Sequence, residues 1–471
     1  GYWLPPAILL SSLVPGLIIF FLREEWHAVR TMLNLGGAVV KMVLIIVLIW
    51  GVLQETEYET RFSLAPGMDL VLHADALSVL FVTLSTGLWL VTTLYAVGYL
   101  EGHAHRSRFF GFFSLCVSAT VGIAMAGNML TFVFFYELLT LATYPLIVHR
   151  GTPEALRGGR VYLTYTLIGG AVLLAGVAWL RALAGPLDFT ETGLLAGRTD
   201  LDQGSLIAIF VLLVGGLGVK AALVPLHGWL PQAMIAPAPV SALLHAVAVV
   251  KAGAFGIVRV VYDVYGISFA SELKVLLPLA VIASITIIYG SVRALFQDDL
   301  KKRLAYSTVS QVSYITLGTA VLGPVASIGG IVHLVHQGVM KITLFFCAGN
   351  YAETLGIHHV SEMHGTGRRM PWTTAAFTLG ALGMIGVPPL AGFISKWYLG
   401  YGALVEQQGW VIWVLMVSGL LNAAYFLPIL YAAWFRQPAD TWPKERDYGR
   451  YETHWMLLLP PVITALLALL I

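Results

Sequence analysis

The stretch GLGVKAALVPLH, from Gly216 to His227, places a lysine and a proline inside the apolar run at residues 205–227. A run of about 20 apolar residues is long enough to cross the hydrocarbon core of a bilayer. Lys220 therefore lies at membrane depth, where a charged side chain costs on the order of 3 kcal/mol. Pro225 interrupts the hydrogen bonds of such a helix, and unwound backbone is tolerated there where it is packed in protein or lines a wet cavity. The stretch predicts a broken membrane helix that carries a functional lysine.

A second stretch, GVPPLAGFISK from Gly386 to Lys396, repeats the combination of proline, glycine and lysine about 170 residues later. Broken helices at corresponding positions are typical of transporters built from inverted repeats. About five predicted spans separate the two stretches, and a repeat with an odd number of spans must be inverted in its second copy. The spacing of the two stretches is thus what two inverted five-helix repeats would show.

The composition indicates a membrane protein throughout. The 471 residues are 58% hydrophobic and 11% charged, with a mean hydropathy of +0.81, whereas a soluble domain is roughly 25% charged. We predict an all-α polytopic membrane protein with a single integral domain over residues 1–471. About fourteen spans are expected, with the seventh and twelfth discontinuous, at residues 4–22, 33–53, 76–100, 109–127, 129–148, 161–182, 205–227, 238–262, 274–293, 304–323, 326–350, 372–400, 408–432 and 454–471.

The loops differ in charge according to their side of the membrane. Most loop arginines and lysines follow odd-numbered spans, including Arg23, Arg106, Arg108, Arg150, Arg157, Arg160, Lys301, Lys302, Arg303, Arg368, Arg369, Arg436, Lys444, Arg446 and Arg450. The positive-inside rule places these loops in the cytoplasm and both termini on the opposite side. The acidic loops around residues 55–69 and 188–202 are expected to form a solvated rim. Basic residues near span ends are expected to extend to the interface: Lys41, Arg181, Arg259 and Arg293.

The expected location is the inner (plasma) membrane of a bacterial or archaeal cell. The first span, at residues 4–22, has no basic segment before it and no cleavage site of the A-x-A type. We expect it to be a retained helix. Because the chain begins with glycine instead of methionine, we also expect part of the natural N-terminus to be missing.

Four lysines and one glutamate lie inside predicted spans: Lys220, Lys251, Lys341, Lys396 and Glu137. Arginine stays charged at any accessible pH, whereas a desolvated lysine can release and regain a proton. Glu137 has no basic neighbour in its own span, so its partner is expected across a helix interface. Lys220 is the candidate partner. The alternative is a static buried ion pair that fixes packing.

Three histidines accompany these lysines. His245 precedes Lys251 by six positions, which places the two on different helix faces. His333 and His336 are one turn apart, and Lys341 returns to the side of His333 roughly 12 Å further along the axis. A histidine in a membrane helix is often only an interhelical hydrogen bonder, but together these residues favour a hydrated polar axis.

The sequence carries no clear sign of a metal or cofactor site. Two histidines at this spacing without further ligands are a weak metal signal. Cys116 and Cys347 lie in apolar runs without a ligand-like or redox spacing, so they read as small core residues. We expect no cofactor, no metal and no nucleic acid.

Five motifs resemble the antiporter-like membrane subunits shared by Mrp-type cation/proton antiporters, respiratory complex I and membrane-bound hydrogenases. They are YELLTLATYP (136–145), VKAALVPLHGWLP (219–231), APAPVSALLH (236–245), DLKKRLAYS (299–307) and MKITLFF (340–346). The resemblance covers about the third to the thirteenth span, and the region of the fifth span is most similar to D-type Mrp subunits. It implies fourteen helices, with two inverted five-helix repeats over helices 4–8 (residues 109–262) and 9–13 (residues 274–432), and with breaks in the seventh and twelfth helices.

The resemblance also implies roles for single residues. Glu137 and Lys220 match the family's ion pair, Lys251 and His245 its connecting elements, Lys341 its central lysine and Lys396 its exit-side lysine. Two positions depart from the family pattern. Gln232 stands where the Trp-Leu-Pro motif is usually followed by Asp, and Gln337 stands at the usual histidine position, with His336 one residue earlier.

We therefore expect a proton-translocating subunit of a multisubunit monovalent cation (Na+)/proton antiporter. Its partners would be other membrane subunits, protons, a monovalent cation and the lipid bilayer. The alternatives are a proton-pumping membrane subunit of a complex I-like NADH:quinone oxidoreductase or membrane-bound hydrogenase, which would make the chain part of a translocase, and a subunit of an inorganic-carbon uptake complex. A non-conducting scaffold bundle is the remaining hypothesis.

Overall fold

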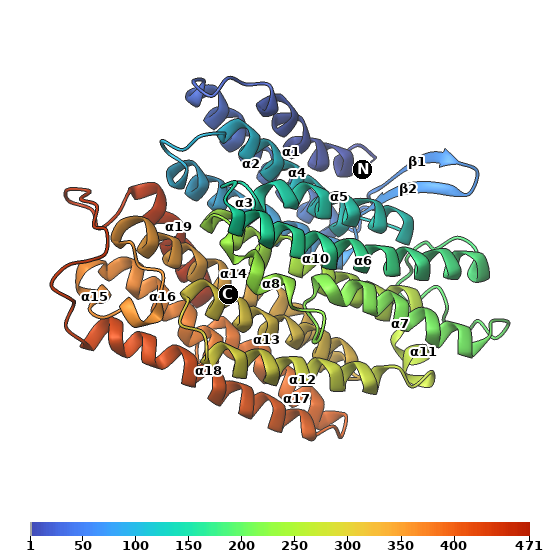
Figure 1. The fold of residues 1–471 in the computed structure, drawn as a ribbon. Coiled ribbons are helices and arrows are strands. Elements are labelled where there is room, and N and C mark those ends of the chain that lie inside the picture. Colours follow the sequence, from blue (N-terminus) through green and yellow to red (C-terminus); the bar gives the residue numbers. More distant parts are fainter. Residues whose placement is uncertain (1) are drawn as a thin grey trace. The chain divides into compact units, whose positions relative to one another are not determined.

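The computed structural model describes residues 2–471, which are mostly helical with one β-hairpin (Figure 1). The elements are α1 (Leu4–Phe20), α2 (His27–Leu53), β1 (Glu59–Ala65), β2 (Met68–His73), α3 (Ala76–Tyr99), α4 (Arg106–Ala124), α5 (Met129–Ile147), α6 (Pro153–Ala184), α7 (Gln203–Lys220), α8 (Trp229–Gln232), η1 (Ala233–Ile235), α9 (Ala238–Ala242), η2 (Leu243–Val247), α10 (Val249–Arg259), η3 (Val260–Tyr265), α11 (Ile267–Glu272), α12 (Leu276–Leu295), α13 (Leu300–Ala320), α14 (Pro324–Leu355), η4 (Val360–Glu362), α15 (Thr366–Arg369), α16 (Pro371–Ile385), α17 (Ala391–Val405), α18 (Trp410–Phe435) and α19 (Trp455–Leu470).

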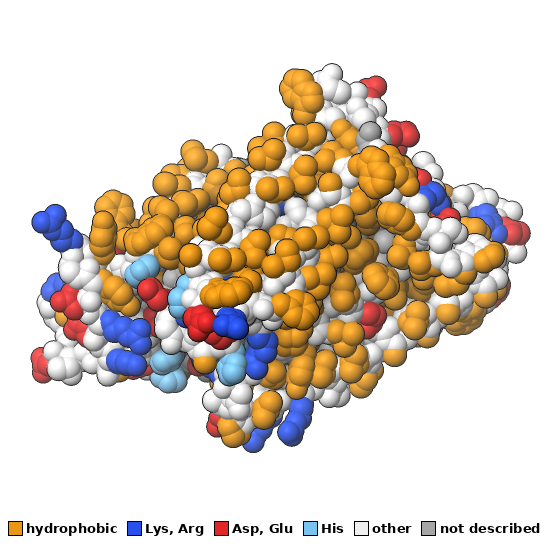
Figure 2. Space-filling model, turned by 90° about the horizontal axis from the view of Figure 1, so that it is seen from above, with side chains coloured by type: hydrophobic (Ala, Val, Ile, Leu, Met, Phe, Trp, Pro, Cys, Tyr) orange, Lys and Arg blue, Asp and Glu red, His pale blue; other side chains and the backbone are white. Residues whose placement is uncertain are grey.

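The chain is a multi-span membrane protein. Within residues 2–471, ten helical segments are long and apolar enough to cross a bilayer, and two shorter apolar helices are α1 and α19. Hydrophobic side chains cover most of the face that Figure 2 shows. The exposed hydrophobic side chains of the chain include Val43, Ile46 and Trp50 of α2. Such a surface is stable against lipid or against partner helices, and costly in water.

The residues divide into two compact units, and each is described by itself. The first consists of residues 1–93, 102–221 and 247–278, and the second of residues 94–101, 222–246 and 279–471. In the first unit α1 packs on α2 and α4, α4 on α5, and α6 on α7. In the second unit α14 is central, since it packs on α13, α16, α17 and α19.

The two predicted helix breaks are confirmed. Helix α7 ends at Lys220, and regular helix resumes only at Trp229. Helix α16 ends at Ile385, and α17 begins at Ala391. Pro388 and Pro389 lie four positions after Met384 and Ile385 and have no N–H, so they leave the carbonyl oxygens of these two residues without their helical donors.

Two local features were not foreseen from the sequence. The span predicted at residues 238–262 is present as an apolar segment over Ala238–Tyr265, but the π-helical segments η2 and η3 interrupt its α-helix. A π-turn inserts a residue without a proline or glycine signature, so periodicity does not reveal it. Part of the predicted acidic rim is an antiparallel hairpin of β1 and β2, with Glu59 opposite His73 and a turn at Gly67.

The hairpin is held within the first unit by backbone and charge contacts. The N–H of Gly127 donates to the oxygen of Val71 at 2.8 Å. Arg61 on β1 forms ion pairs with Asp188 at 2.7 Å and Asp69 at 3.6 Å. The acidic side chains of two loops thus meet one arginine, which the sequence alone does not indicate.

Candidate functional site

Glu137 and Lys220 lie in the first unit, on α5 and α7, but they do not form a direct ion pair. Lys220 is completely buried, and its ammonium donates a hydrogen bond of 2.7 Å to the backbone oxygen of Tyr136. The same ammonium lies 3.6 Å from the centre of the Tyr136 ring. Among the described residues, no carboxylate oxygen lies within 4.0 Å of the Lys220 ammonium. The charges of Lys220 and Glu137 still interact over a longer distance.

A glycine makes room for the carboxylate of Glu137. A Cβ added to Gly170 on α6 would collide with this carboxylate, since it would lie 2.0 Å from Oε1. Oε1 of Glu137 is buried and has no hydrogen-bond partner among the described residues. The carboxylate therefore faces α6, one residue along α5 from the carbonyl that holds Lys220.

Hydroxyl groups continue from Lys220 along one face of α5. Thr140 donates to the same Tyr136 oxygen at 3.3 Å, and Tyr162 on α6 donates to the oxygen of Thr140 at 3.1 Å. One turn further, Thr143 lies 3.4 Å from the thiol of Cys116. These positions recur at helical spacing, so they share one face of α5.

His245 lies in the π-helical segment η2, and Lys251 lies six residues later in α10. Lys251 is completely buried in α10, within the first unit. His245 belongs to the second unit, where its ring stacks on Phe345 at 4.3 Å and its Nε2 lies 3.3 Å from the sulfur of Met234. The predicted connecting residues are thus both buried, one in each unit.

In the second unit, a chain of side chains links Lys341 to the broken helix. Lys341 on α14 donates to the Ser307 hydroxyl at 2.6 Å, and the Tyr425 hydroxyl donates to the same oxygen at 2.9 Å. The same Tyr425 hydroxyl lies 2.5 Å from Oδ1 of Asn422, so its single proton can bind either acceptor. The amide of Asn422 then donates to the backbone oxygen of Met384 at 3.1 Å.

Lys396 also donates to the backbone oxygen of Met384. Its ammonium donates to Met384 at 2.7 Å and to Ile385 at 3.2 Å. These are the two carbonyl groups that Pro388 and Pro389 leave without helical donors. The break in the helix thus provides the ligands of the buried lysine, and Lys341 and Lys396 are joined through four intervening groups.

His333 reaches this oxygen by a second branch. Its ring lies 2.6 Å from the Ser395 hydroxyl and 3.1 Å from Oε1 of Gln311. The amide of Gln311 donates to Met384 at 3.4 Å. His336 is buried nearby on α14, but within residues 2–471 its Nδ1 has no hydrogen-bond partner. The network includes His333 and does not include this nitrogen of His336.

Comparisons with known proteins identify the family of the chain. Residues 126–422 match the family described as NADH:quinone oxidoreductase/Mrp antiporter, TM. The chain belongs to this family. Residues 66–110 match a second family, NADH-Ubiquinone oxidoreductase (complex I), chain 5 N-terminus. The resemblance inferred from the five motifs is therefore confirmed.

Two relatives and one solved structure illustrate the range of the family. The chain is 37% identical to the N subunit of an NADH-quinone oxidoreductase from Desulforudis audaxviator, over 79% of this chain and 73% of the relative. It is 28% identical to the D subunit of a Na(+)/H(+) antiporter from Alkalihalophilus pseudofirmus, over 91% and 86%. A chain in a structure of the Mrp complex from Dietzia sp. DQ12-45-1b has the same fold, with a TM-score of 0.85 at 22% identity, over 99% of this chain and 94% of that one.

Several residues of this family member's networks were missed by sequence reasoning. They are hydroxyl and amide side chains of α13, α17 and α18: Ser307, Gln311, Ser395, Asn422 and Tyr425. Such residues are common in membrane helices and carry no charge. A usable signal was the polarity of α13, whose stretch STVSQVS (307–313) is completely buried.

Arg259 does not extend to the interface, contrary to the prediction. It is 1% exposed and is clamped between Asp75, at 2.5 Å, and Asp263, at 2.6 Å. Burial raises the pKa of the Asp75 carboxyl, but the charge and hydrogen bonds of Arg259 outweigh it and lower this pKa to about 2. We interpret this cluster as structural, because the Arg259 guanidinium is paired with the carboxylates of both Asp75 and Asp263.

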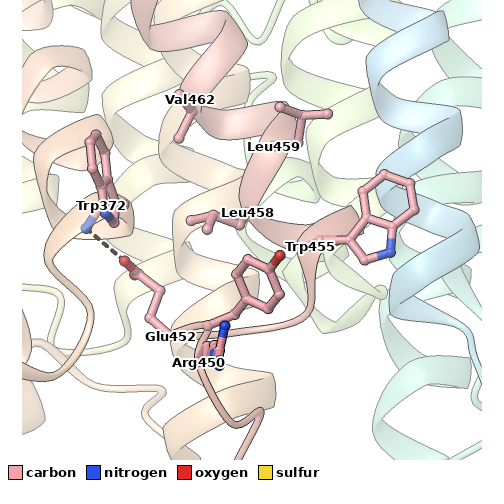
Figure 3. Close-up of a pocket in the computed structure, with 8 residues that line it drawn as sticks. Trp372, Arg450, Glu452, Trp455, Leu458, Leu459 and Val462 are labelled. Atoms are coloured by element: carbon pink, nitrogen blue, oxygen red, sulfur yellow. Dashed lines mark hydrogen bonds between the residues drawn. The ribbon is translucent and has the colours of Figure 1, made fainter.

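A groove of about 390 Å³ in the second unit lies apart from these networks (Figure 3). Trp372, Trp455 and Leu458 line it, and none of the predicted site residues does. The carboxylate of Glu452 accepts hydrogen bonds from the backbone N–H groups of Trp372 at 2.7 Å and Thr373 at 3.1 Å. It therefore caps the start of α16, whose own cap position, Met370, offers no side-chain acceptor.

Proposed function

We propose that the chain is a proton-translocating subunit of a multisubunit monovalent cation/proton antiporter. The observation that carries the proposal is the hydrogen-bonded chain from Lys341 through Ser307, Tyr425 and Asn422 to the Met384 oxygen that holds Lys396. The hydroxyl groups of such a chain can accept and release protons, and the amide and the carbonyl connect the two buried lysines by hydrogen bonds. The hypothesis of a non-conducting scaffold bundle does not predict a hydrogen-bonded chain between buried lysines.

In this proposal the protons enter beside Glu137 and Lys220 and leave beside Lys396. Lys251, His245, His333 and Lys341 carry them between these ends, and His336 supports the same region. Movement of Glu137 toward and away from Lys220 would bias the lysine between its charged and neutral forms. The separated arrangement of the two residues supports such a swing, because the carboxylate has an unfilled hydrogen-bonding position.

The finer architecture belongs to the same proposal. Fourteen membrane helices, with inverted repeats at residues 109–262 and 274–432, would place the two broken helices in corresponding positions. The basic loops would face the cytoplasm of a bacterial or archaeal cell, across its plasma membrane. Partner membrane subunits would cover apolar surface such as that of α2. The name of one relative, which describes a Na(+)/H(+) antiporter, supports sodium as the exchanged ion.

The test is ion-driven proton movement in membrane vesicles that contain the whole complex. Lys220→Ala and Lys341→Ala should abolish the pH change that follows addition of Na+ or K+. Lys302→Ala is the matched control, because Lys302 is an exposed lysine of α13. Copurification of partner subunits checks assembly. Unchanged proton movement in an assembled Lys220→Ala complex would refute the proposal.

A second candidate function is proton pumping driven by electron transfer in partner subunits. It is favoured by the 37% identity to the N subunit of an NADH-quinone oxidoreductase. Purification of the intact complex separates the two functions. Copurifying iron–sulfur and quinone-site subunits would select the redox complex, and small membrane subunits alone would select the antiporter.

A further inference from the structure

Lys41 is a buried lysine that neither mechanism uses. It lies 14 residues after the start of α2 and 12 before its end, which corresponds to about 20 Å from either end. Its side chain is 0% exposed. The prediction that Lys41 extends to the interface was therefore wrong, because a lysine side chain is too short to reach the bilayer surface from this depth.

Hydroxyl groups from two other helices receive its ammonium. Lys41 donates to the Ser12 hydroxyl of α1 at 2.6 Å, and Ser12 lies 2.7 Å from the Ser118 hydroxyl of α4. Ser118 can donate in turn to the oxygen of Ser114 at 2.9 Å. Gly16 lets α1 and α4 approach here, since a Cβ at this position would lie 2.7 Å from that of Ser114.

No carboxylate belongs to this site. Helices α1, α2, α3 and α4 contain no aspartate or glutamate, and their arginines, Arg30, Arg106 and Arg108, lie in the first turns of α2 and α4. Helix α3 contributes Trp89, whose ring centre is 5.1 Å from the Lys41 ammonium. A hydroxyl accepts from an ammonium but can also donate to a neutral amine. The site therefore suits both protonation states, whereas an ion pair would favour only the charged one.

The surroundings also favour bound water. Several buried polar atoms in the same group of helices have no hydrogen-bond partner in the described part of the chain, and they include Oγ of Ser114, Nε1 of Trp89 and Nδ2 of Asn34. Ser114 lies one turn from Ser118, and Asn34 lies two turns before Lys41 on the same face of α2. Buried polar groups are normally satisfied, and where protein groups do not suffice, ordered water does so.

We propose that Lys41, Ser12 and Ser118 form an additional proton-exchange site of this subunit. The Lys41 ammonium transfers one proton to a water molecule held beside Ser118 and Ser114, which leaves a neutral amine and a hydronium ion. The reverse transfer restores the ammonium. The inference rests on the proposed function, because a proton-exchange site has a use only in a proton-translocating subunit.

The experiment compares Lys41→Met and Lys41→Arg in the vesicle assay of the whole complex. Methionine fills a similar volume but holds no proton, and arginine keeps the charge but never releases its proton. A proton-exchange site predicts that both variants, once assembled, lower the rate by about tenfold or more. A purely structural cation predicts that assembled Lys41→Arg keeps the rate and pH profile of the wild type, and that result would overturn the inference.

Ser118→Ala keeps the inference testable if the Lys41 variants fail to assemble. Loss of this hydroxyl should shift the pH profile of proton movement while leaving the amount of complex unchanged, and an unshifted profile would overturn the inference. Lys220→Ala runs in parallel as the reference. If Lys220→Ala is inactive and the Lys41 and Ser118 variants behave as wild type, only this inference fails. If Lys220→Ala is fully active, the proposed function fails as well.

Discussion

The ammonium of Lys220 binds the backbone oxygen of Tyr136, the residue next to Glu137, and not the carboxylate of Glu137 itself. A buried lysine held by a carbonyl and an aromatic ring keeps its hydrogen bond when the carboxylate moves. The charge interaction can then vary without loss of the ammonium's ligand. In this arrangement, a movement of the Glu137 carboxylate would change its charge interaction with Lys220 and leave the hydrogen bond of Lys220 in place.

Gly170→Ala should impair proton movement without unfolding the protein. The added methyl group would occupy the place of the Glu137 carboxylate and force it to a different position. We expect a loss of about tenfold in rate, comparable to the loss of an interaction of about 1.4 kcal/mol. The measurement is ion-driven proton movement in vesicles. Gly215→Ala is the matched control, because nothing lies within 4 Å of a Cβ there, and equal rates for both variants would contradict the prediction.

Tyr425→Phe should interrupt the chain between Lys341 and Lys396. It removes only the hydroxyl that contacts Ser307 and Asn422. The rate of proton movement should fall about tenfold or more if this hydroxyl passes protons, with the complex intact. Tyr431→Phe, at an exposed position on the same helix, should leave the rate unchanged. Full activity of Tyr425→Phe would mean that protons take another path.

Asp75→Asn should destabilise the protein in a pH-dependent way. The pKa of Asp75 is lowered to about 2 in the folded state, against about 3.9 in an unfolded chain. The stabilisation, on the order of 2 kcal/mol, is therefore present above about pH 4 and is lost as the pH falls toward 2. Thermal unfolding should show a larger difference between wild type and Asp75→Asn at pH 7 than at pH 3. The same difference at both pH values would refute the assignment.

Glu452→Gln should weaken the start of α16. Glutamine keeps one acceptor oxygen in place of the two that bind Trp372 and Thr373, and it loses the favourable charge at a helix N-terminus. We expect a loss of about 1 kcal/mol, measured as a lower midpoint of thermal unfolding. Asp440→Asn, in the exposed loop before Glu452, serves as the control and should not shift the midpoint.

Much of the helical framework could be predicted from local pattern. Apolar length located the helices, and prolines located both breaks, because each is a property of consecutive residues. The π-segments η2 and η3 could not be predicted, since a π-turn depends on how neighbouring helices pack. The depth of Lys41 was misjudged because α2 begins at His27, earlier than its apolar run suggested.

The candidate site was only partly predictable for a similar reason. Buried charges such as Lys341 and Lys396 stand out in a sequence because their cost demands an explanation. The neutral groups that join them, such as Ser307 and Asn422, cost little and look like any other polar residue of a membrane helix. Their role depends on contacts between residues more than a hundred positions apart, which no local pattern contains.

The Met384 oxygen has two lone pairs but three donors, from Lys396, Asn422 and Gln311. The donors therefore compete, and the charged one binds most strongly. In the proposed relay, loss of the Lys396 proton would weaken its hydrogen bond to this oxygen, and the two amides could then bind the oxygen more closely. Asn422 contacts Tyr425, and Gln311 contacts His333. A change in the charge of Lys396 would therefore reach both hydrogen-bonded branches through one backbone oxygen.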